Sequence, residues 1–202
     1  MVPAFLVGSA AGFVAGTLGE YLMHRWMHRG LAMKRVHGRH HLLKIGQGWL
    51  GEFIDYARGG IVPILAFVGP LTWPLGMPTV AAGFLVGAGA HVAFAAYSHQ
   101  VQHEKPHLVF WMKKPVHFLH HDQKMWTKNF GISTDFWDRV FGTYQDVEWQ
   151  PDTRGLSNPL DEFVRIDWGS PPKLDREARA AWEREVLRAQ RADHDPARSE
   201  AA

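Results

Sequence analysis

Residues 61–97 contain no Lys, Arg, Asp or Glu, and this uncharged run restricts the possible folds more than any other feature. Its middle is interrupted by residues that favour turns, namely Pro70, Pro74, Gly76 and Pro78. The run therefore predicts two apolar helices, roughly Phe53–Trp73 and Thr79–Tyr97, each near the ~20 residues that cross a hydrocarbon core. Small residues that permit close helix packing occur in the second helix: Gly83, Gly87 and Gly89.

A further apolar stretch, Val2–Met23, carries Glu20 as its only charged residue and is also long enough to cross a membrane. A cleaved signal peptide would have positive charge before the apolar run, and none precedes this one. For the longer run the alternative is a buried hairpin in a soluble protein. Three such stretches with little polar surface between them favour a membrane protein instead. We expect an all-α integral membrane bundle.

Positive charge is placed unevenly around these stretches. The basic residues that flank them are Arg25, Arg29, Lys34, Arg35, Arg39, Lys44, Arg58, Lys105, Lys113 and Lys114. The N-terminal tip and the turn near Pro74 have no Lys or Arg. Because cytoplasmic loops carry the excess of positive charge, the N-terminus is predicted to lie outside and the histidine-bearing segments at the cytoplasmic face.

Composition excludes several kinds of site. The chain has no cysteine, so it has no disulfides, thiolate zinc sites, cysteine-ligated iron–sulfur clusters or cysteine nucleophile. Any metal must be held by nitrogen and oxygen. The net charge of +2 is too small to indicate nucleic-acid binding, and no nucleic-acid partner is expected.

Ten of the thirteen histidines form four clusters. Two clusters have the spacing H-x3-H: His24 with His28, and His99 with His103. Two have the spacing H-x2-H-H: His37, His40 and His41, then His117, His120 and His121. The order is a pair and a triplet, the membrane hairpin, then a pair and a triplet again. This is a weak internal repeat of ligand pattern.

The spacing has a physical reason, because helical residues three and four apart share one face. Each cluster thus presents its imidazoles together, at the same predicted membrane face. Ten imidazoles are costly to bury unless metal ions accept their lone pairs. Ten nitrogens divide naturally over two ions, and such ligands suit iron, zinc or copper. The alternative is a histidine-rich surface that sequesters metal, but such surfaces are usually low-complexity tracts.

The other histidines and nearby carboxylates are less informative. His91 is predicted to lie in the bundle core or in a pocket, and His107 at the surface or behind a ligand. Glu20, one turn before His24, either orients a ligand imidazole or caps the membrane boundary. Asp122 and Asp135 are similar candidates. For Asp138 we favour a surface ion pair with the adjacent Arg139.

Beyond residue 150 the chain becomes polar. Residues 1–150 are predicted to form the catalytic domain, and residues 151–202 a polar extension without chemistry of its own. Within it, Pro151–Pro172 is expected to be an irregular surface segment and Leu174–Arg191 a charged helix. The remaining residues, which include His194, are expected to be a disordered tail.

The four clusters, together with the run Asn129–Tyr144, resemble the fatty acid hydroxylase superfamily, also called the sterol desaturase family, over about Gly19–Tyr144. The resemblance implies a di-iron centre at the cytoplasmic membrane face, which zinc can occupy in isolated protein, and O2-dependent oxidation of a lipid C–H bond. It implies ten metal ligands: His24, His28, His37, His40, His41, His99, His103, His117, His120 and His121. Four spans are common in the family, and an interfacial helix near Leu108–Leu119 is expected to replace the fourth.

Several alternatives stay open at this stage. Glu20–His41 also resembles the bacterial carotenoid hydroxylases, whereas the run Phe136–Arg139 favours the fatty acid or sterol branch, with hydroxylation and desaturation both possible. A non-redox zinc hydrolase would need few ligands and a nearby Glu base. A non-catalytic metal-binding or transport protein is the third class, and transport would place the ligands within the spans. For the oxygenase, the absence of a cysteine cluster and of evident flavin or haem motifs predicts a separate electron-donor protein, a reductase or small carrier.

Overall fold

The computed structural model describes residues 1–33, 37–38, 40–41, 48–151, 155–156, 158–169 and 184, and every regular element among them is helical. This confirms the all-α prediction for the described part of the chain. The predicted charged helix Leu174–Arg191, apart from Arg184, and the tail lie outside the described residues.

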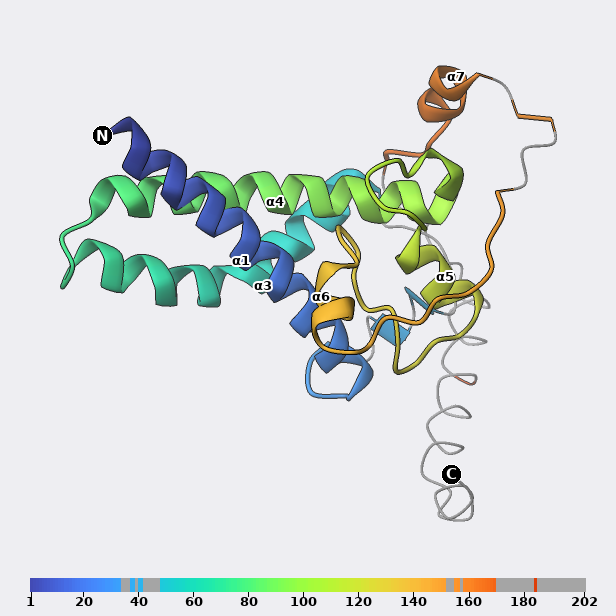
Figure 1. The fold of residues 1–202 in the computed structure, drawn as a ribbon, viewed down its shortest axis with the longest axis horizontal. Helices are drawn as coiled ribbons and strands as arrows, with labels where there is room; N and C mark the ends of the chain where they lie inside the picture. The colour runs from blue at the N-terminus through green and yellow to red at the C-terminus, as the bar shows by residue number, and fades with distance from the viewer. Residues whose placement is uncertain are drawn as a thin grey trace, which may run out of the picture.

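Three long helices form the body of the molecule: α1 (Val2–His28), α3 (Trp49–Thr72) and α4 (Pro78–Glu104). Among the described residues these three are long and apolar enough to cross a membrane, as predicted. The N-terminus and the α3–α4 turn lie at one end of the bundle, and the shorter elements gather at the other end (Figure 1). The start of α3, the end of α4 and the end of α1 therefore lie at the same end of the bundle.

The helices differ from the predicted spans in length. We predicted that the first and third apolar helices end at Met23 and Tyr97, whereas α1 continues to His28 and α4 to Glu104. A helix of 27 residues rises about 40 Å, while the hydrocarbon core is about 30 Å thick. The last turns of α1 and α4 consequently project beyond the apolar layer, and these turns carry the H-x3-H pairs.

Close approach of α1 and α4 depends on glycines in both helices. A Cβ added at Gly8 or Gly12 would lie 2.2 or 2.1 Å from a carbonyl oxygen of α4. One added at Gly83 or Gly87 would lie 2.1 or 1.9 Å from a carbonyl oxygen of α1. The prediction for Gly83 and Gly87 is confirmed, and backbone contact replaces side-chain packing at this interface. For Gly89 it is wrong, because nothing lies within 4 Å of an added Cβ.

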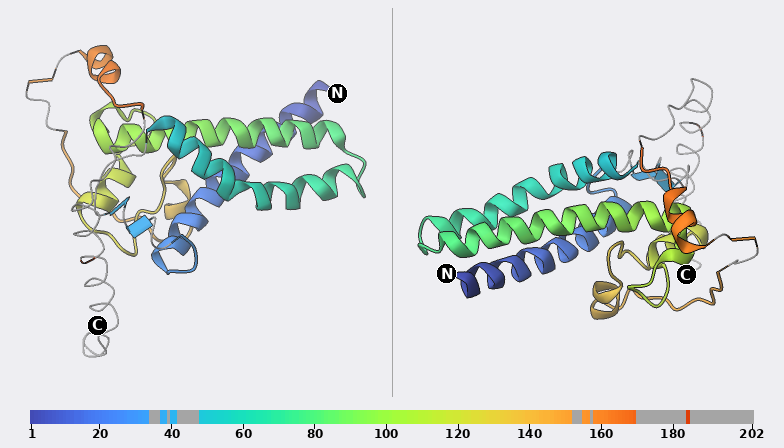
Figure 2. Two further views of the ribbon diagram at one scale, coloured as in Figure 1. Left: turned by 180° about the vertical axis from the view of Figure 1, so that it is seen from behind. Right: turned by 90° about the horizontal axis from the view of Figure 1, so that it is seen from above.

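α3 packs on α4 and only touches α1, which leaves most of its surface uncovered. The right-hand view of Figure 2 shows α4 in the middle of the bundle, with α3 on one side and α1 on the other. The large apolar side chains of α3 are exposed, among them Val62 (72%) and Phe67 (56%). Glu52 is its one buried residue among those described. A helix that is apolar yet exposed fits an environment of lipid.

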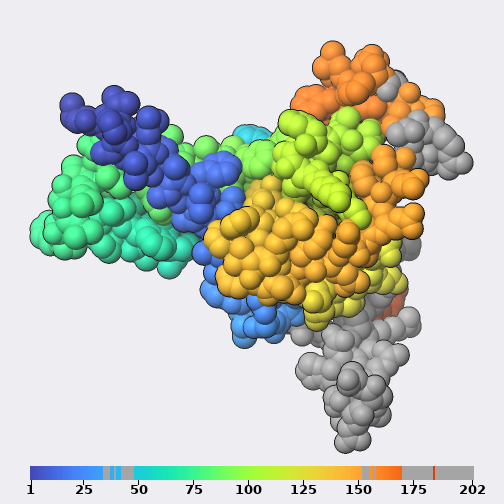
Figure 3. Space-filling view, in the orientation of Figure 1, coloured from blue at the N-terminus to red at the C-terminus, as the bar shows by residue number. Residues whose placement is uncertain are grey.

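The remaining helical elements form a cap over the end of the bundle: η1 (Pro106–Leu108), α5 (Val116–Asp122), α6 (Phe136–Val140) and α7 (Pro159–Val164). The gold segment of this cap, around α6, lies against α1, whereas the orange α7 stands apart from α1 (Figure 3). The predicted interfacial helix at Leu108–Leu119 is wrong. Residues 109–115 are not helical, and α5 begins only after Pro115, because proline disfavours the α conformation in the residue before it.

Candidate metal centre

The histidine pairs lie at the ends of two long helices, and the histidines of the triplets are in helical conformation. His24 and His28 are in the last turns of α1, and His99 and His103 are in the last turns of α4. His37, His40 and His41 adopt helical conformation, and His117, His120 and His121 lie on α5. The four clusters meet in the cap, where most of these rings are buried. The predicted convergence at one end of the bundle is therefore what the structure has.

Nine of the ten imidazoles form two compact groups. In each group the candidate ligand atoms all lie within 4.8 Å of one another. Group A contains His24, His28, His37, His41 and His120. Group B contains His40, His99, His103 and His117. Each group could hold one metal ion, so the geometry provides two sites.

In each triplet, the middle histidine belongs to a different group from the first histidine. His37 and His41 belong to group A, but His40 between them belongs to group B. In the second triplet His117 belongs to group B, whereas His120 belongs to group A. Residues i and i+4 of a helix point in nearly the same direction and residue i+3 points to one side, which explains this division. As a result, each of the two candidate sites contains histidines from both triplets.

His121 is the tenth predicted ligand and belongs to neither group. Its position in its triplet matches that of His41, so the repeat would place it in group B. Its ring centroid lies 4.0 Å from that of His41 in group A, and 4.5 Å from that of His40, 4.8 Å from that of His103 and 4.6 Å from that of His117 in group B. Both of its ring nitrogens are buried without a hydrogen-bond partner among the described residues. Ligation by His121 remains a prediction.

The spacing of the nitrogens suits a shared cation. Nε2 of His28 lies 2.8 Å from Nε2 of His37, 3.0 Å from that of His41 and 2.9 Å from that of His120. Bonds of about 2.1 Å from one ion to several imidazoles would place neighbouring nitrogens about 3 Å apart. Nε2 of His24 is buried with no hydrogen-bond partner among the described residues. The donor set therefore fits a metal ion in group A.

Burial keeps the imidazoles neutral. It lowers the pKa values of His37, His117 and His121 well below the ordinary value, and neighbouring imidazoles lower them further. Burial also lowers the pKa of His120 to about 4, against a smaller opposing effect of its hydrogen bond with the backbone of Lys128. Neutral imidazoles have the lone pairs that metal ligation requires.

Oxygen atoms behind the imidazoles fix their orientation. Nδ1 of His24 donates to the carbonyl oxygen of Phe130 at 2.6 Å, and Nδ1 of His120 donates to that of Lys128 at 2.7 Å. Oε1 of Glu52 lies 2.8 Å from Nδ1 of His99, which is an ion-pair distance without hydrogen-bond geometry. An oxygen at Nδ1 leaves the Nε2 lone pair directed into the site, which is the usual arrangement behind metal-bound histidine.

Glu52 was not predicted. The second span was expected to begin at Phe53, which left this carboxylate outside it, whereas α3 begins at Trp49 and buries Glu52 in its first turn. A carboxylate at the start of an apolar stretch, at the depth of the histidine clusters, was the available signal.

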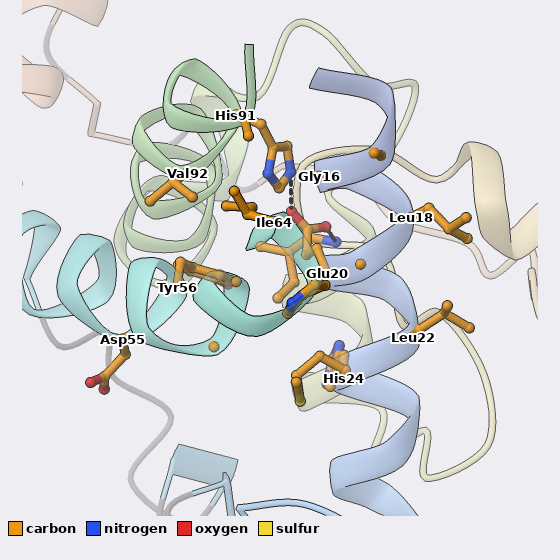
Figure 4. A pocket seen from close by; sticks show the side chains of 18 of the residues that line it. Gly16, Leu18, Glu20, Leu22, His24, Asp55, Tyr56, Ile64, His91 and Val92 are labelled. Atoms are coloured by element: carbon orange, nitrogen blue, oxygen red, sulfur yellow. Dashed lines mark hydrogen bonds and ion pairs between the residues drawn. The ribbon is translucent and has the colours of Figure 1, made fainter. Parts of the chain in front are cut away.

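Glu20 does not orient a ligand imidazole. Its Oε1 accepts the backbone N–H groups of Ile132 and Ser133, both at 2.8 Å, and its Oε2 lies 3.1 Å from Nε2 of His91. Both alternatives weighed for Glu20 from the sequence are therefore wrong. Its imidazole partner is His91, and the pair connects α1 to α4 at the cavity wall (Figure 4).

Asp138 is likewise a structural carboxylate, and the predicted ion pair with Arg139 is wrong. Asp138 is fully buried and accepts the N–H groups of Phe130 at 2.8 Å and Gly131 at 2.7 Å, together with the Thr143 hydroxyl at 2.7 Å. Burial raises its pKa, and these hydrogen bonds oppose the shift. Asp135 pairs with Arg139 at 2.6 Å instead, because it lies one helical turn earlier.

The segment 129–133 thus connects the parts of the centre. Its Phe130 carbonyl holds His24, while its Ile132 carbonyl accepts hydrogen bonds from Ser98 and Gln102 of α4. Gln102 also accepts the backbone N–H of His117 at 2.9 Å. One short segment therefore sets the relative positions of histidines on three helices. The sequence marked the run Asn129–Tyr144 but gave no role to Gln102.

A cavity of about 420 Å³ leads from the histidines into the bundle. This volume lies within the range of small-molecule sites. At the cap end it is lined by His24, His37, His40, His99 and His117, from both groups. On α3 one stripe lines it: Glu52, Asp55, Tyr56, Gly59, Gly60, Pro63, Ile64 and Phe67. From Glu52 to Phe67 a helix rises about 22 Å, so the cavity runs lengthwise along the apolar helices.

The small residues of the wall keep this space open. Gly59 of α3 and Gly19 of α1 both line the cavity, and nothing lies within 4 Å of a Cβ added at either position. At the far end, the ring of Phe67 stacks on that of Phe84 with centroids 5.6 Å apart. The cavity thus has a polar end at the histidines and an apolar end between the spans.

Fold and site together define a membrane helical bundle whose cap brings histidines into two groups that could hold metal. The family model for fatty acid hydroxylase matches residues 9–143, and the chain belongs to this family. The chain is also 29% identical, over 149 residues, to a dihydroceramide fatty acyl 2-hydroxylase of Arabidopsis thaliana. That similarity covers 69% of this chain and 61% of the relative, so less than two thirds of the relative is represented. No solved structure matches the chain.

Proposed function

We propose that this protein is an O2-dependent membrane lipid hydroxylase with two iron ions, one in group A and one in group B. The observation that carries the proposal is the cavity, whose polar end is lined by histidines of both groups and whose apolar end lies between the spans. When bound, the two ions would supply the oxidation of an unactivated C–H bond with O2, which no amino-acid side chain can perform.

The substrate best suited to this cavity is a fatty acyl chain. An acyl chain is linear and apolar, and the cavity is elongated along α3 with mostly apolar walls. Its length of about 22 Å exceeds half of the roughly 30 Å hydrocarbon core, so it can take in most of a chain from one leaflet. The family and the acyl hydroxylase relative support the same substrate class.

The position of the histidines favours oxidation near the carboxyl end of the acyl chain. The groups lie beyond the apolar part of the bundle, at the depth of lipid headgroups. With the headgroup at the cap and the methyl end near Phe67 and Phe84, the carbons beside the histidines are the first few after the carbonyl. The Arabidopsis relative is named as a 2-hydroxylase, which is in keeping with this placement.

The side chains have separate tasks in this proposal. The ten histidines hold the ions, and Glu52 and the Phe130 carbonyl keep His99 and His24 in the ligating orientation. The walls of α1, α3 and α4 align the acyl chain and exclude water from the reacting carbon. Two electrons come from a separate donor protein. The N-terminus lies outside, and the histidine cap faces the cytoplasm, where the flanking positive charges are concentrated.

The test is metal analysis combined with lipid mass spectrometry under 18O2. Purified protein in nanodiscs should contain two iron ions and, with reductant, add one labelled oxygen to an acyl chain. His120→Ala should lose both metal and product, whereas His107→Ala should lose neither, because His107 is not one of the ten proposed ligands. Product lacking two hydrogens without labelled oxygen would establish a desaturase. Fewer than two metals in the unaltered protein, or no acyl product with iron loaded, would refute the proposal.

A further inference from the structure

The segment 158–169 lies beyond the part of the chain that the family model matches, yet it forms a defined structure. The side chain of Asn158 caps α7 by accepting the backbone N–H groups of Leu160 and Asp161, both at 3.0 Å. Pro159 occupies the first helical position, where a missing N–H costs nothing. The sequence had predicted only an irregular segment here.

α7 is fixed to the end of α4 by an ion pair and by aromatic contacts. Oε2 of Glu162, which is 3% exposed, lies 2.6 Å from Nζ of Lys105. The ring of Trp168 stacks on Tyr97 with centroids 5.8 Å apart and an interplanar angle of 8°, and Phe163 contacts the same ring at 6.3 Å. α7 lies beside the end of α4 in each view that shows both (Figures 1 and 2).

The contacts of Phe163 and Trp168 with Tyr97 place this side of α7 at the depth of the membrane–water interface. Tyr97 is the twentieth residue of α4 counted from Pro78, and about 20 helical residues cross the hydrocarbon core. Tyr and Trp side chains concentrate at such boundaries. The ring of Trp111 also contacts that of Tyr97, with centroids 5.5 Å apart. Phe110, which is 86% exposed, contacts the ring of Trp111. An aromatic cluster therefore forms around Tyr97 at this level.

The outer surface of α7 has an apolar side and a polar side. Leu160 and Val164 lie one turn apart on the same face, and both are 69% exposed. Asp161 and Arg165, also one turn apart, lie on a different face and are exposed as well. Glu162 and Phe163 lie between the two faces, towards α4. A helix attached at the interface with one apolar and one polar exposed face suits the boundary between lipid and water.

We propose that α7 is an interfacial membrane anchor, with Leu160 and Val164 inserted among the lipid acyl chains and with Asp161 and Arg165 in water. The occupant of the apolar face is the bilayer that surrounds the adjacent span. The proposal does not depend on the metal centre or on the reaction. It gives the residues after the family domain a role, which is to hold the end of α4, and with it His99 and His103, at a fixed depth.

The absence of cysteine in the chain permits a direct test with single cysteine reporters. Leu160→Cys and Val164→Cys probe the apolar face, and Asp161→Cys on the same helix is the matched control. Each variant is labelled with a small fluorophore and placed in phosphatidylcholine nanodiscs that hold one protein copy. Nitroxide-labelled lipids should quench positions 160 and 164 several-fold more than position 161, and aqueous iodide should show the reverse order.

Two results would overturn the anchor. Equal quenching by iodide at all three positions would show that the apolar face lies in water. Protection at positions 160 and 164 that appears only with two copies per nanodisc, without quenching by labelled lipid, would show that a second copy of the chain covers this face. Because the substitutions lie on exposed positions, correct folding is checked by unchanged unfolding temperatures of the three variants.

Discussion

Nδ1 of His24 lies 2.6 Å from the carbonyl oxygen of Phe130, although 106 residues separate them in the sequence. The contact joins α1 to the segment 129–133, and Asp138 in turn holds that segment through the N–H groups of Phe130 and Gly131. The orientation of a candidate ligand is therefore set by a carboxylate that does not contact any histidine ligand. The same arrangement explains why Asp138 is fully buried.

Asp138→Asn should destabilise the protein and weaken metal binding together. The amide cannot accept both backbone N–H groups and the Thr143 hydroxyl as a carboxylate does, so we expect a loss of roughly 1–3 kcal/mol in unfolding free energy. Thermal unfolding in detergent and iron content measure the two effects. Asp135→Asn is the control, because its exposed pair with Arg139 contributes less than about 1 kcal/mol. Equal effects of the two substitutions would contradict the role given to Asp138.

Glu52→Gln should weaken group B selectively. Replacing a carboxylate that orients a ligating histidine typically lowers metal affinity 10- to 100-fold, and Glu52 lies 2.8 Å from Nδ1 of His99. Titration with iron against a competing chelator should show one site weakened by about this factor and the other unchanged. Asp55→Asn is the control, since Asp55 also lines the cavity but lies near Arg58. Equal weakening of both sites in Glu52→Gln would exclude a specific action through His99.

The sequence predicted what depends on local patterns. The apolar stretches and the i, i+3, i+4 histidine spacing led to three spans and a convergent cap, because both features arise within single helices. The sequence did not predict which histidine of a triplet belongs to which group. The grouping of His40 and His120 depends on how the helices pack against one another. The roles of Glu20 and Asp138 were missed for the same reason, because their partners are backbone N–H groups, which have no sequence signature.

His121→Ala should remove one metal ion and leave the other. The repeat places His121 with group B, as the counterpart of His41 in group A. Three group B rings lie within 4.8 Å of its ring, and the ring of His41 lies at 4.0 Å. We expect the iron content to fall from two towards one per chain, with His41→Ala giving the same loss from the other site. His107→Ala, which alters neither group, should retain two. Two firmly bound ions in His121→Ala would mean that His121 is not a ligand.

The metal-free protein should lose stability as the pH falls below about 6.5. Burial lowers the pKa of His120 to about 4, whereas in the unfolded chain it lies near 6.5. Between these values the unfolded state binds a proton that the folded state does not, so unfolding becomes more favourable as the pH decreases. The lowered pKa values of His37, His117 and His121 act in the same direction. Unfolding temperatures measured from pH 8 to pH 4 should therefore be level above pH 6.5 and decline below it, and iron should reduce the decline.

Gly59→Leu should block the cavity while the metal centre remains intact. Gly59 lines the cavity, and nothing lies within 4 Å of an added Cβ, so a side chain at this position begins in open space and the larger leucine occupies part of the cavity. Leucine also stabilises a helix relative to glycine, by about 0.8 kcal/mol. Unfolding of α3 would therefore not explain a loss of activity. We expect two bound iron ions and strongly reduced hydroxylation of long acyl chains, with shorter chains less affected. Gly69→Leu is the matched control, because Gly69 lies on the same helix, also has nothing within 4 Å, and does not line the cavity. Unchanged turnover of long chains by Gly59→Leu would mean that the substrate does not pass this part of α3.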